Sequence, residues 1–386
     1  MFMENNTFIL KILIILISIS TILLIVGTFR SGLVTSEDEV IKIGVIDSFS
    51  GDGAVYGEWV RKNAELAAED INKRGGFNGK KIELIYEDHK AVAQESVNAY
   101  QRLKLKDVDM MTVGWSSPTL AIAPLANADK KILFTHSATT PLYSTKDDYT
   151  FRISINAEQF AKEEADFVFN ELDYRNIAVI YINNDFGLGM KKVFIEHFRR
   201  LGGNIVFEDN FNQESRDFKS LITKVEFADP DAVFLVGHMT ENGLLVKQMR
   251  ELGIDKQIMS DIYSVEGDEF LKQAGSASEG IIYVAPYFDE SKSQEYFNEY
   301  LETYGEEPNY YAQVYDIFFV LEKAIDNCKE IDTDCIKDEL FKIQDFEGVS
   351  GIIYFDEYGD VTKPVAFNII KNGEFVRFNT SQQLPT

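Results

Sequence analysis

The segment from residue 41 to residue 88 has the pattern of a strand, a polar loop, a helix and a second strand. Its first apolar run, Ile41 to Ile46, is typical of a strand buried on both faces of a parallel sheet. Turn residues from Asp47 to Gly53 follow, and apolar positions then recur at helical spacing from Val60 to Ile71. Gly75-Gly76 suits the end of that helix. Such a unit predicts a ligand site outside the carboxyl ends of the strands, where the polar loop lies.

The same alternation continues along the chain. Short apolar runs predict further strands at residues 110–113, 132–134, 177–182, 205–207, 232–236, 257–259, 281–285, 365–370 and 375–378. Helical spacing predicts helices at residues 119–128, 157–172, 188–201, 217–227, 241–252, 265–273, 293–304 and 310–328. Alternation of this kind is typical of parallel sheets covered by helices on both faces. Because so many strands fit two sheets better than one, we expect an α/β protein with two lobes.

Three segments are candidates for the connections between the lobes. They lie at residues 150–156, near Pro286 and at residues 358–360. We therefore expect lobe 1 to contain residues 40–154 and 286–357, and lobe 2 to contain residues 155–285 and 358–386. The three connections would form a hinge.

Residues 1–39 differ from the rest of the chain in composition. Lys11 precedes an uncharged stretch at residues 12–29, and a helix of that length spans roughly 27 Å, close to the hydrocarbon thickness of a bilayer. A buried core helix is a poor alternative, because no face of the stretch is polar. A long signal peptide and a single membrane anchor both fit, and we favour the anchor because no clear small-residue cleavage site precedes Ser31. No cysteine directly follows the stretch, which excludes a bacterial lipoprotein attachment.

Charge and cysteine content narrow the class of protein. The formal net charge is −25, whereas nucleic-acid binding requires a basic face, so we exclude nucleic acid as a partner. Cys328 and Cys335 are the only cysteines. Outside the cytoplasm they would form a short-loop disulfide contributing about 2–3 kcal/mol. Two free buried thiols are the alternative.

A dinucleotide-binding enzyme is a competing interpretation of the first loop. Gly51, Gly53 and Gly57 follow a strand, but their spacing is one residue too long for the dinucleotide fingerprint. Glu87 and Asp88 also come too late for the acid that binds a ribose. The sequence contains no GxSxG, HExxH or P-loop motif. We therefore expect no catalysis, no cofactor and no metal.

Several short motifs together resemble one protein family. They are Lys42-Ile43-Gly44-Val45, Gly51–Gly57, Ala67–Asn72, Gly75–Lys80, Ile82–Leu84, Asn183–Gly187, Gly202-Gly203, Asp217-Phe218 and Phe355–Asp360. As a set they make the chain after Val40 similar to the type I periplasmic binding proteins, specifically to the branched-chain amino-acid receptors of ABC importers. The resemblance implies two Rossmann-like lobes with parallel sheets, a three-strand hinge, and a ligand captured in the cleft between the lobes.

The loop after the third strand carries the first candidate site residues. Ser117 and Pro118 suit the N-cap and the first position of a helix, whose N-terminus favours an anion. The resemblance makes Ser117 a contact of the ligand carboxylate and places Trp115 and Ser116 beside it. A plain helix cap, with Trp115 as a packing residue, is the alternative.

The fourth and first loops add further candidates in lobe 1. The resemblance makes Thr139 a second hydroxyl donor and lets Ser137, next to Ala138, face a ligand amino group. Three small residues before Pro141 also suit a simple turn. Tyr56 matches an aromatic lining position of the family.

In lobe 2 the resemblance provides aromatic and acidic candidates. Phe186 stands where the family has a tyrosine, and His238 stands where the amino-acid receptors have an aromatic residue. A lone histidine is also a common structural residue. Asp261 is the candidate partner of a ligand ammonium, with Glu241 as substitute, although Asp261 also suits a turn.

These observations predict an extracytoplasmic substrate-binding protein of an ABC importer, monomeric and working with a membrane permease. It would close its hinge around a small ligand, and an amino acid is the expected ligand. A membrane-tethered sensor that signals through a partner protein is the alternative function.

Overall fold

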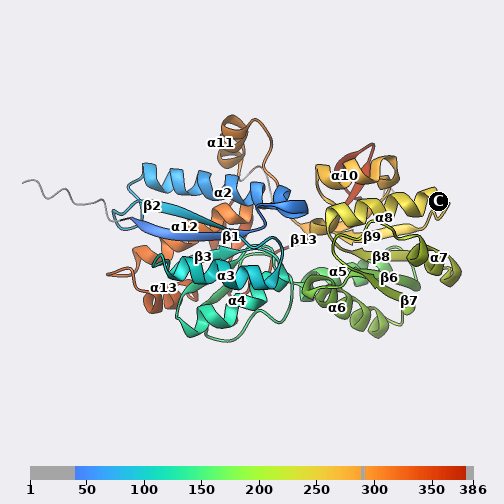
Figure 1. Ribbon diagram of the computed structural model, residues 1–386, viewed down its shortest axis with the longest axis horizontal. Coiled ribbons are helices and arrows are strands. Elements are labelled where there is room, and N and C mark those ends of the chain that lie inside the picture. The colour runs from blue at the N-terminus through green and yellow to red at the C-terminus, as the bar shows by residue number, and fades with distance from the viewer. Residues whose placement is uncertain (1–39, 288–290, 292, 380–386) are drawn as a thin grey trace, which may run out of the picture. The chain divides into compact units, whose positions relative to one another are not determined.

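The computed structural model describes residues 40–287, 291 and 293–379 (Figure 1). Its first sheet has five strands in the order β2-β1-β3-β4-β5, and every neighbouring pair is parallel. The strands are β1 (Ile41–Asp47), β2 (Ile82–Asp88), β3 (Met110–Val113), β4 (Ile132–Thr135) and β5 (Thr150–Arg152). The predicted double burial of β1 is confirmed, since nearly all its residues are buried. This sheet is the core of the first lobe.

The helices of the first lobe come from two separate parts of the chain. The early ones are α2 (Ala54–Lys73), α3 (Ala93–Lys104) and α4 (Ser116–Ala128). The late ones are α11 (Gln294–Tyr304), α12 (Ala312–Asp326) and α13 (Thr333–Leu340). Helix α12 packs on α2, and α13 contacts β4 (Figure 1). The chain therefore returns to the first lobe after building most of the second.

The second sheet has seven strands in the order β14-β13-β10-β9-β8-β6-β7. They are β6 (Asn176–Ile182), β7 (Asn204–Phe211), β8 (Ala232–Val236), β9 (Gln257–Asp261), β10 (Ile282–Pro286), β13 (Val365–Lys371) and β14 (Glu374–Arg377). Its helices are α5 (Ala157–Asn170), α6 (Asp185–Leu201), α7 (Lys219–Ala228), α8 (Met239–Glu251), α9 (Ile262–Val265) and α10 (Asp268–Ala274).

The second sheet is parallel from β10 to β7, as expected, and antiparallel only at its β13-β14 edge. Strand β13 runs antiparallel to β10, and β14 runs antiparallel to β13. The turn between β13 and β14 contains Asn372 and Gly373, whose φ angles of 54° and 75° suit a tight hairpin. A two-residue hairpin can join only antiparallel strands.

The chain passes between the two sheets three times, after β5, after β10 and after the short hairpin β11 (Phe346–Gly348) and β12 (Gly351–Ile353). A partly buried ion pair connects two of these passages, because Arg152 Nε lies 2.9 Å from Asp360 Oδ1. Asn156 donates to the other oxygen of Asp360 at 3.2 Å. The residue boundaries expected for the lobes stay a prediction.

Local structure differs from the expectations at several places. The range expected as one helix, residues 265–273, is interrupted, since α9 ends at Val265 and α10 begins at Asp268, with Gly267 between them extended at a φ of 167°. Helices α3 and α13 were not predicted. Helix α13 contains Cys335, which forms the expected disulfide with Cys328, with an S–S distance of 2.02 Å.

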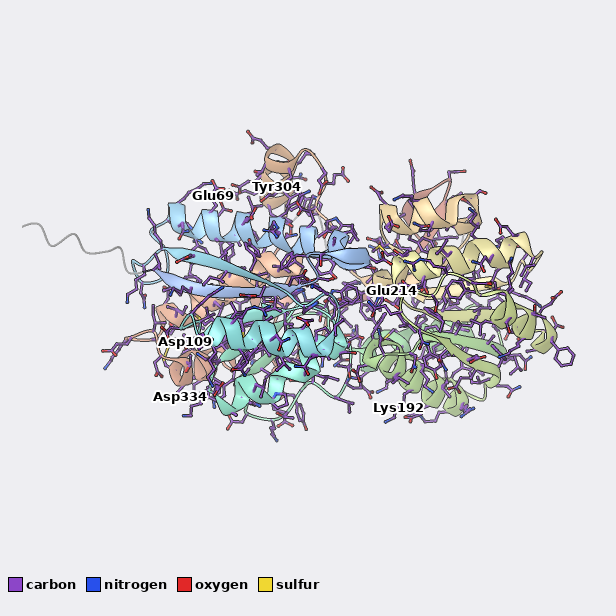
Figure 2. All side chains as sticks on the ribbon, in the orientation of Figure 1. Glu69, Asp109, Lys192, Glu214, Tyr304 and Asp334 are labelled. Atoms are coloured by element: carbon purple, nitrogen blue, oxygen red, sulfur yellow. A yellow bond between two sulfur atoms is a disulfide. The ribbon has the colours of Figure 1, made fainter. Side chains whose placement is uncertain are left out.

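Charged side chains cover the outer surfaces of the lobes, as Figure 2 shows for the labelled Glu69, Asp109 and Asp334. Many form exposed ion pairs, such as Lys130 with Asp334 at 2.9 Å. Such pairs add little stability. The predicted anchor lies outside the described residues, and none of the helices within them is long and apolar enough to cross a bilayer.

Candidate functional site

A pocket lies between the two lobes at their strand ends, with an empty volume of about 520 Å³ that includes open solvent. The first lobe lines it with Tyr56, Ala91, Trp115, Ser116, Ser117, Pro118, Ser137 and Tyr311. The second lobe lines it with Asn184, Phe186, Gln213, His238 and Tyr263. Except for Tyr311, these residues follow the carboxyl ends of β1 to β4 and β6 to β9. This is where open α/β sheets bind ligands.

Most of the residues predicted from the sequence meet in this pocket. Those on its wall are Tyr56, Trp115, Ser116, Ser117, Ser137, Phe186 and His238. Ala138, Thr139 and Asp261 are fully buried but are not part of the wall. The Thr139 hydroxyl has no hydrogen-bond partner among the described residues, so its expected role as a ligand donor stays a prediction.

The wall also contains residues that sequence reasoning missed: Ala91, Pro118, Asn184, Gln213, Tyr263 and Tyr311. Position after a strand end is a signal that could have found all of them except Tyr311. Tyr311 stands at the start of α12, about 250 residues after the first loop in the chain, and only tertiary packing brings it there.

Helix α4 presents its N-terminus to the pocket. The helix begins at Ser116 with Trp115 at the N-cap, so the expectation that Ser117 is the N-cap is wrong. Trp115 has no side-chain oxygen with which to cap the helix. The first-turn N–H groups of such a helix favour an anion. Ser117 Oγ accepts a hydrogen bond from the N–H of Asp185 in the second lobe, at 3.3 Å.

Trp115 has an unusual backbone that the surrounding groups hold in place. Its φ is 66°, a left-handed conformation that costs a non-glycine residue about 1–3 kcal/mol. Its N–H donates to Ser137 Oγ at 3.1 Å, and its indole N–H donates to Asp47 Oδ1 at 3.0 Å. Strain of this kind is concentrated at ligand-binding sites.

Asp47 is part of a buried hydrogen-bonded pair beneath the pocket. Its Oδ2 lies 2.7 Å from His136 Nε2, and both side chains are fully buried. Burial alone would raise the pKa of Asp47, but the hydrogen bond and charge of His136, with the charge of His89, hold that pKa below its ordinary value. Thr112 Oγ1 lies 2.7 Å from the other ring nitrogen of His136. The network fixes the orientation of the Trp115 indole.

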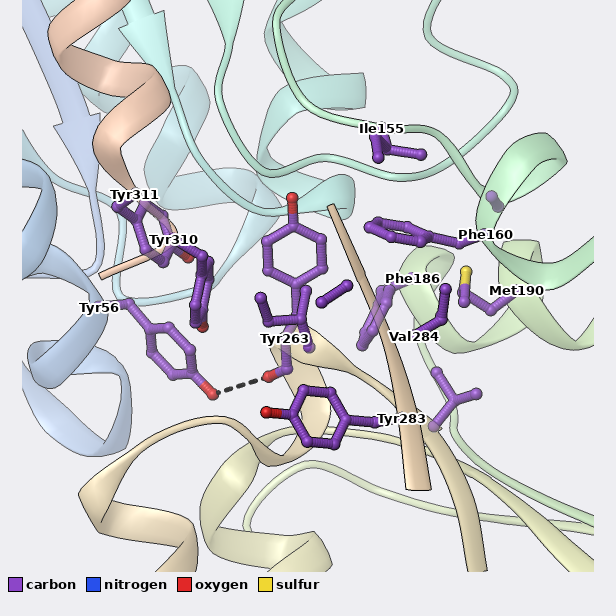
Figure 3. Close-up of a cluster of buried hydrophobic side chains, with 14 of the residues drawn as sticks. Tyr56, Ile155, Phe160, Phe186, Met190, Tyr263, Tyr283, Val284, Tyr310 and Tyr311 are labelled. Atoms are coloured by element: carbon purple, nitrogen blue, oxygen red, sulfur yellow. Dashed lines mark hydrogen bonds between the residues drawn. The ribbon is translucent and has the colours of Figure 1, made fainter. Parts of the chain in front are cut away.

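The lobes touch across the pocket. The Tyr56 hydroxyl donates to the carbonyl of Tyr263 at 3.3 Å (Figure 3) and accepts from the N–H of Met239 at 3.2 Å. Asp52 and Arg216 form an ion pair between the lobes. Figure 3 shows Tyr310 and Tyr311 beside Tyr56, facing Tyr263. The structure therefore describes a state in which the two pocket walls are in contact.

His238 packs against aromatic rings from both lobes. Its ring lies 4.5 Å from the Trp115 ring and is stacked on Phe186 at 5.8 Å. Asn184 Nδ2 lies 3.3 Å from His238 Nε2, so that nitrogen accepts and the proton belongs on Nδ1. Burial lowers the pKa of His238 to about 4, so the ring is neutral at pH 7.

The two acidic candidates bind protein groups. Asp261 accepts from the N–H of Tyr263 at 3.0 Å and from Ser264 Oγ at 2.7 Å, which caps α9. Burial raises its pKa to about 7. Glu241 accepts from the N–H of Glu214 at 2.7 Å, and burial raises its pKa. The structure does not bring either carboxylate into the pocket wall.

Strand ends of two sheets that meet around one pocket, with a hinge between the sheets, define a two-lobed ligand-binding protein. A sequence model of the family described as periplasmic binding protein matches residues 40–374. The chain belongs to this family. It is a binding protein and not an enzyme.

Similar proteins share this architecture. The leucine-, isoleucine-, valine-, threonine- and alanine-binding protein of Pseudomonas aeruginosa is 26% identical over 330 residues, covering 84% of this chain and 87% of that protein. A solved leucine-binding protein from Thermotoga maritima is 28% identical, with a TM-score of 0.83 over 88% of this chain and 98% of the other. The branched-chain amino-acid transporter substrate-binding protein of Streptococcus pneumoniae, solved with isoleucine, is 29% identical, with a TM-score of 0.79 and coverage of 87% and 98%.

Proposed function

We propose that the chain is the extracytoplasmic substrate-binding protein of an ABC importer and captures a small carboxylate ligand between its lobes. The observation that carries the proposal is the pocket wall, to which both lobes contribute the residues at their strand ends. A ligand seated there bridges the lobes. It therefore favours the closed form in proportion to its extra affinity for that form.

The carboxylate is supported by the start of α4. First-turn N–H groups and the hydroxyls of Ser116 and Ser117 stand at the pocket wall. The helix dipole adds to their attraction for an anion. The relatives named above bind amino acids by their names, and an amino acid is the ligand that the resemblance suggests.

A role in transport is supported by the name of one relative, which describes it as part of a branched-chain amino-acid transporter. The partner of this chain would then be a membrane permease. Tethering by residues 12–29 and a monomeric state stay predictions.

Ligand-induced closure tests the proposal. The full-length chain is screened by thermal shift against amino acids, carboxylic acids, amides and polyols, and a ligand at one hundred times its Kd adds about 2.7 kcal/mol of stability. Small-angle scattering then measures compaction with the best ligand. We expect a saturable melting shift accompanied by compaction, and a permease that co-purifies with the chain. Co-purification with a chemoreceptor instead would contradict transport and support the tethered sensor.

A further inference from the structure

The described wall of the pocket combines aromatic rings with neutral polar side chains. Its large side chains are the rings of Tyr56, Trp115, Phe186, Tyr263 and Tyr311. Its one group that titrates near neutrality, His238, is uncharged at pH 7. None of the described residues that line it is Asp, Glu, Lys or Arg. A charged group of a ligand therefore has to be satisfied by dipoles and hydrogen bonds.

Three buried carboxylates that follow strand ends beside this wall, those of Asp47, Asp261 and Glu241, already have protein partners. Asp47 binds His136 and the Trp115 indole, Asp261 binds the first turn of α9, and Glu241 binds the N–H of Glu214. Turning any of them toward a ligand would leave buried donors unpaired, which is costly. A ligand ammonium enclosed here would thus have no negative partner, and burying an unpaired charge is strongly unfavourable.

A ligand carboxylate, unlike an ammonium, would find hydrogen-bond partners in this pocket. The N-terminal turn of α4 faces the pocket through Ser116 and Ser117. Ser116 Oγ accepts from the N–H of Thr140 at 3.4 Å and Ser117 Oγ accepts from the N–H of Asp185 at 3.3 Å. Each hydroxyl keeps its own proton to donate, and a carboxylate oxygen can accept it.

We infer that the ligand of this pocket is an apolar or aromatic monocarboxylate without an α-ammonium group. The inference rests on the proposed binding function and narrows its substrate class. The aromatic walls accept the hydrocarbon part, α4 and the hydroxyls accept the carboxylate, and the zwitterion of an amino acid is discriminated against through its ammonium.

Matched ligands test the inference with the full-length chain by isothermal titration calorimetry. Leucine, 4-methylpentanoate and 4-methylpentanamide share one hydrocarbon skeleton, and phenylalanine and 3-phenylpropionate share another. We expect each carboxylate to bind at least tenfold more tightly than its amino acid and its amide. Equal or tighter binding of the amino acid would overturn the inference while leaving the proposed function intact.

The remaining outcomes separate the two proposals. Tighter binding of the amide would overturn the carboxylate assignment but not ligand capture. If no carboxylate, amino acid, amide or polyol binds, both the inference and the proposed function are overturned.

An isosteric variant gives a second readout. Asn184→Asp adds a carboxylate to the wall and keeps an oxygen that can cap α6. We expect the preference for 4-methylpentanoate over leucine to fall at least tenfold. Asn183→Asp is the matched control, because it adds the same charge one residue away at an exposed position outside the wall. An unchanged preference in a folded Asn184→Asp protein, with folding checked by its melting temperature, would overturn the inference.

Discussion

Helices α4 and α6 each start directly after a strand and at the pocket, one in each lobe, but their first turns are built differently. At α6, Asn184 Oδ1 accepts from the N–H of Gly187 at 3.1 Å and satisfies a first-turn donor. At α4, the N-cap residue is Trp115, which has no side-chain acceptor and is held in a left-handed conformation. One helix has a side-chain cap, whereas the other has none and, under the proposed function, would offer its first-turn donors to the ligand.

The two pocket walls also differ in the side chains that they present to the pocket. The first wall combines the serine hydroxyls with the Trp115 indole, which Asp47 and His136 orient from below. The second wall offers the stacked rings of Phe186 and His238. Under the proposed function, the first lobe would hold the carboxylate and the second would contact the hydrocarbon part of the same ligand.

The largest expected effect is at the base of the first wall. Asp47→Ala leaves His136 buried without its partner, and we expect the free energy of unfolding to fall by about 3–5 kcal/mol. Ligand affinity should fall too, because the indole of Trp115 loses its acceptor. Urea unfolding and calorimetry measure the two effects. Asp109→Ala is the control, since the exposed pair of Asp109 with Lys131 should contribute less than about 1 kcal/mol. Equal losses in the two variants would contradict the buried pair.

The next effect concerns the start of α4. Ser117→Ala removes a hydroxyl from the first wall, and we expect carboxylate affinity to fall by about 2 kcal/mol, roughly thirtyfold, since hydrogen bonds to charged groups contribute about 1.5–3 kcal/mol. Stability of the unliganded chain should change much less. Titration calorimetry and a melting curve compare the two. An affinity equal to that of the parent protein would place the carboxylate elsewhere.

A smaller effect concerns pH and the second wall. Burial in the closed form lowers the pKa of His238 to about 4, against an ordinary value of 6.5, so below pH 6.5 the open form takes up a proton that the closed form excludes. Affinity should therefore be full above pH 6.5 and fall as the pH drops toward 4. Between pH 7.5 and 5.5 we expect about a tenfold loss, ~1.4 kcal/mol. His238→Asn should bind with little pH dependence, and a parent-like slope in that variant would assign the effect to another group.

The smallest effect is at the capped helix. Asn184→Ala removes the α6 cap, and we expect the free energy of unfolding to fall by about 1 kcal/mol. Denaturant unfolding measures the loss, and Asn183→Ala serves as the control at the neighbouring exposed position. If Asn184→Ala changed affinity more than Ser117→Ala does, the contrast between the two helices would be reversed.

Sequence reasoning found the pocket best where its residues follow strand ends. Tyr56, Ser117, Phe186 and His238 all lie within ten residues of a buried apolar run, and all line the pocket. Asp261 was also expected in the pocket because it follows the end of a predicted strand. Its side chain instead caps α9, because a buried carboxylate binds the nearest free N–H and hydroxyl donors.

The sequence alone determined the α/β alternation, the two-sheet division and the polar loops at the strand ends, because periodicity and turn chemistry act over a few neighbouring residues. Only the tertiary structure decided that Tyr311 reaches the pocket, that β13 pairs antiparallel with β10, and that Trp115 rather than Ser117 precedes α4. It also decided that the nearby carboxylates bind protein groups. These features depend on contacts and hydrogen bonds between residues that are far apart in the sequence. The local sequence pattern around one residue does not identify such distant partners.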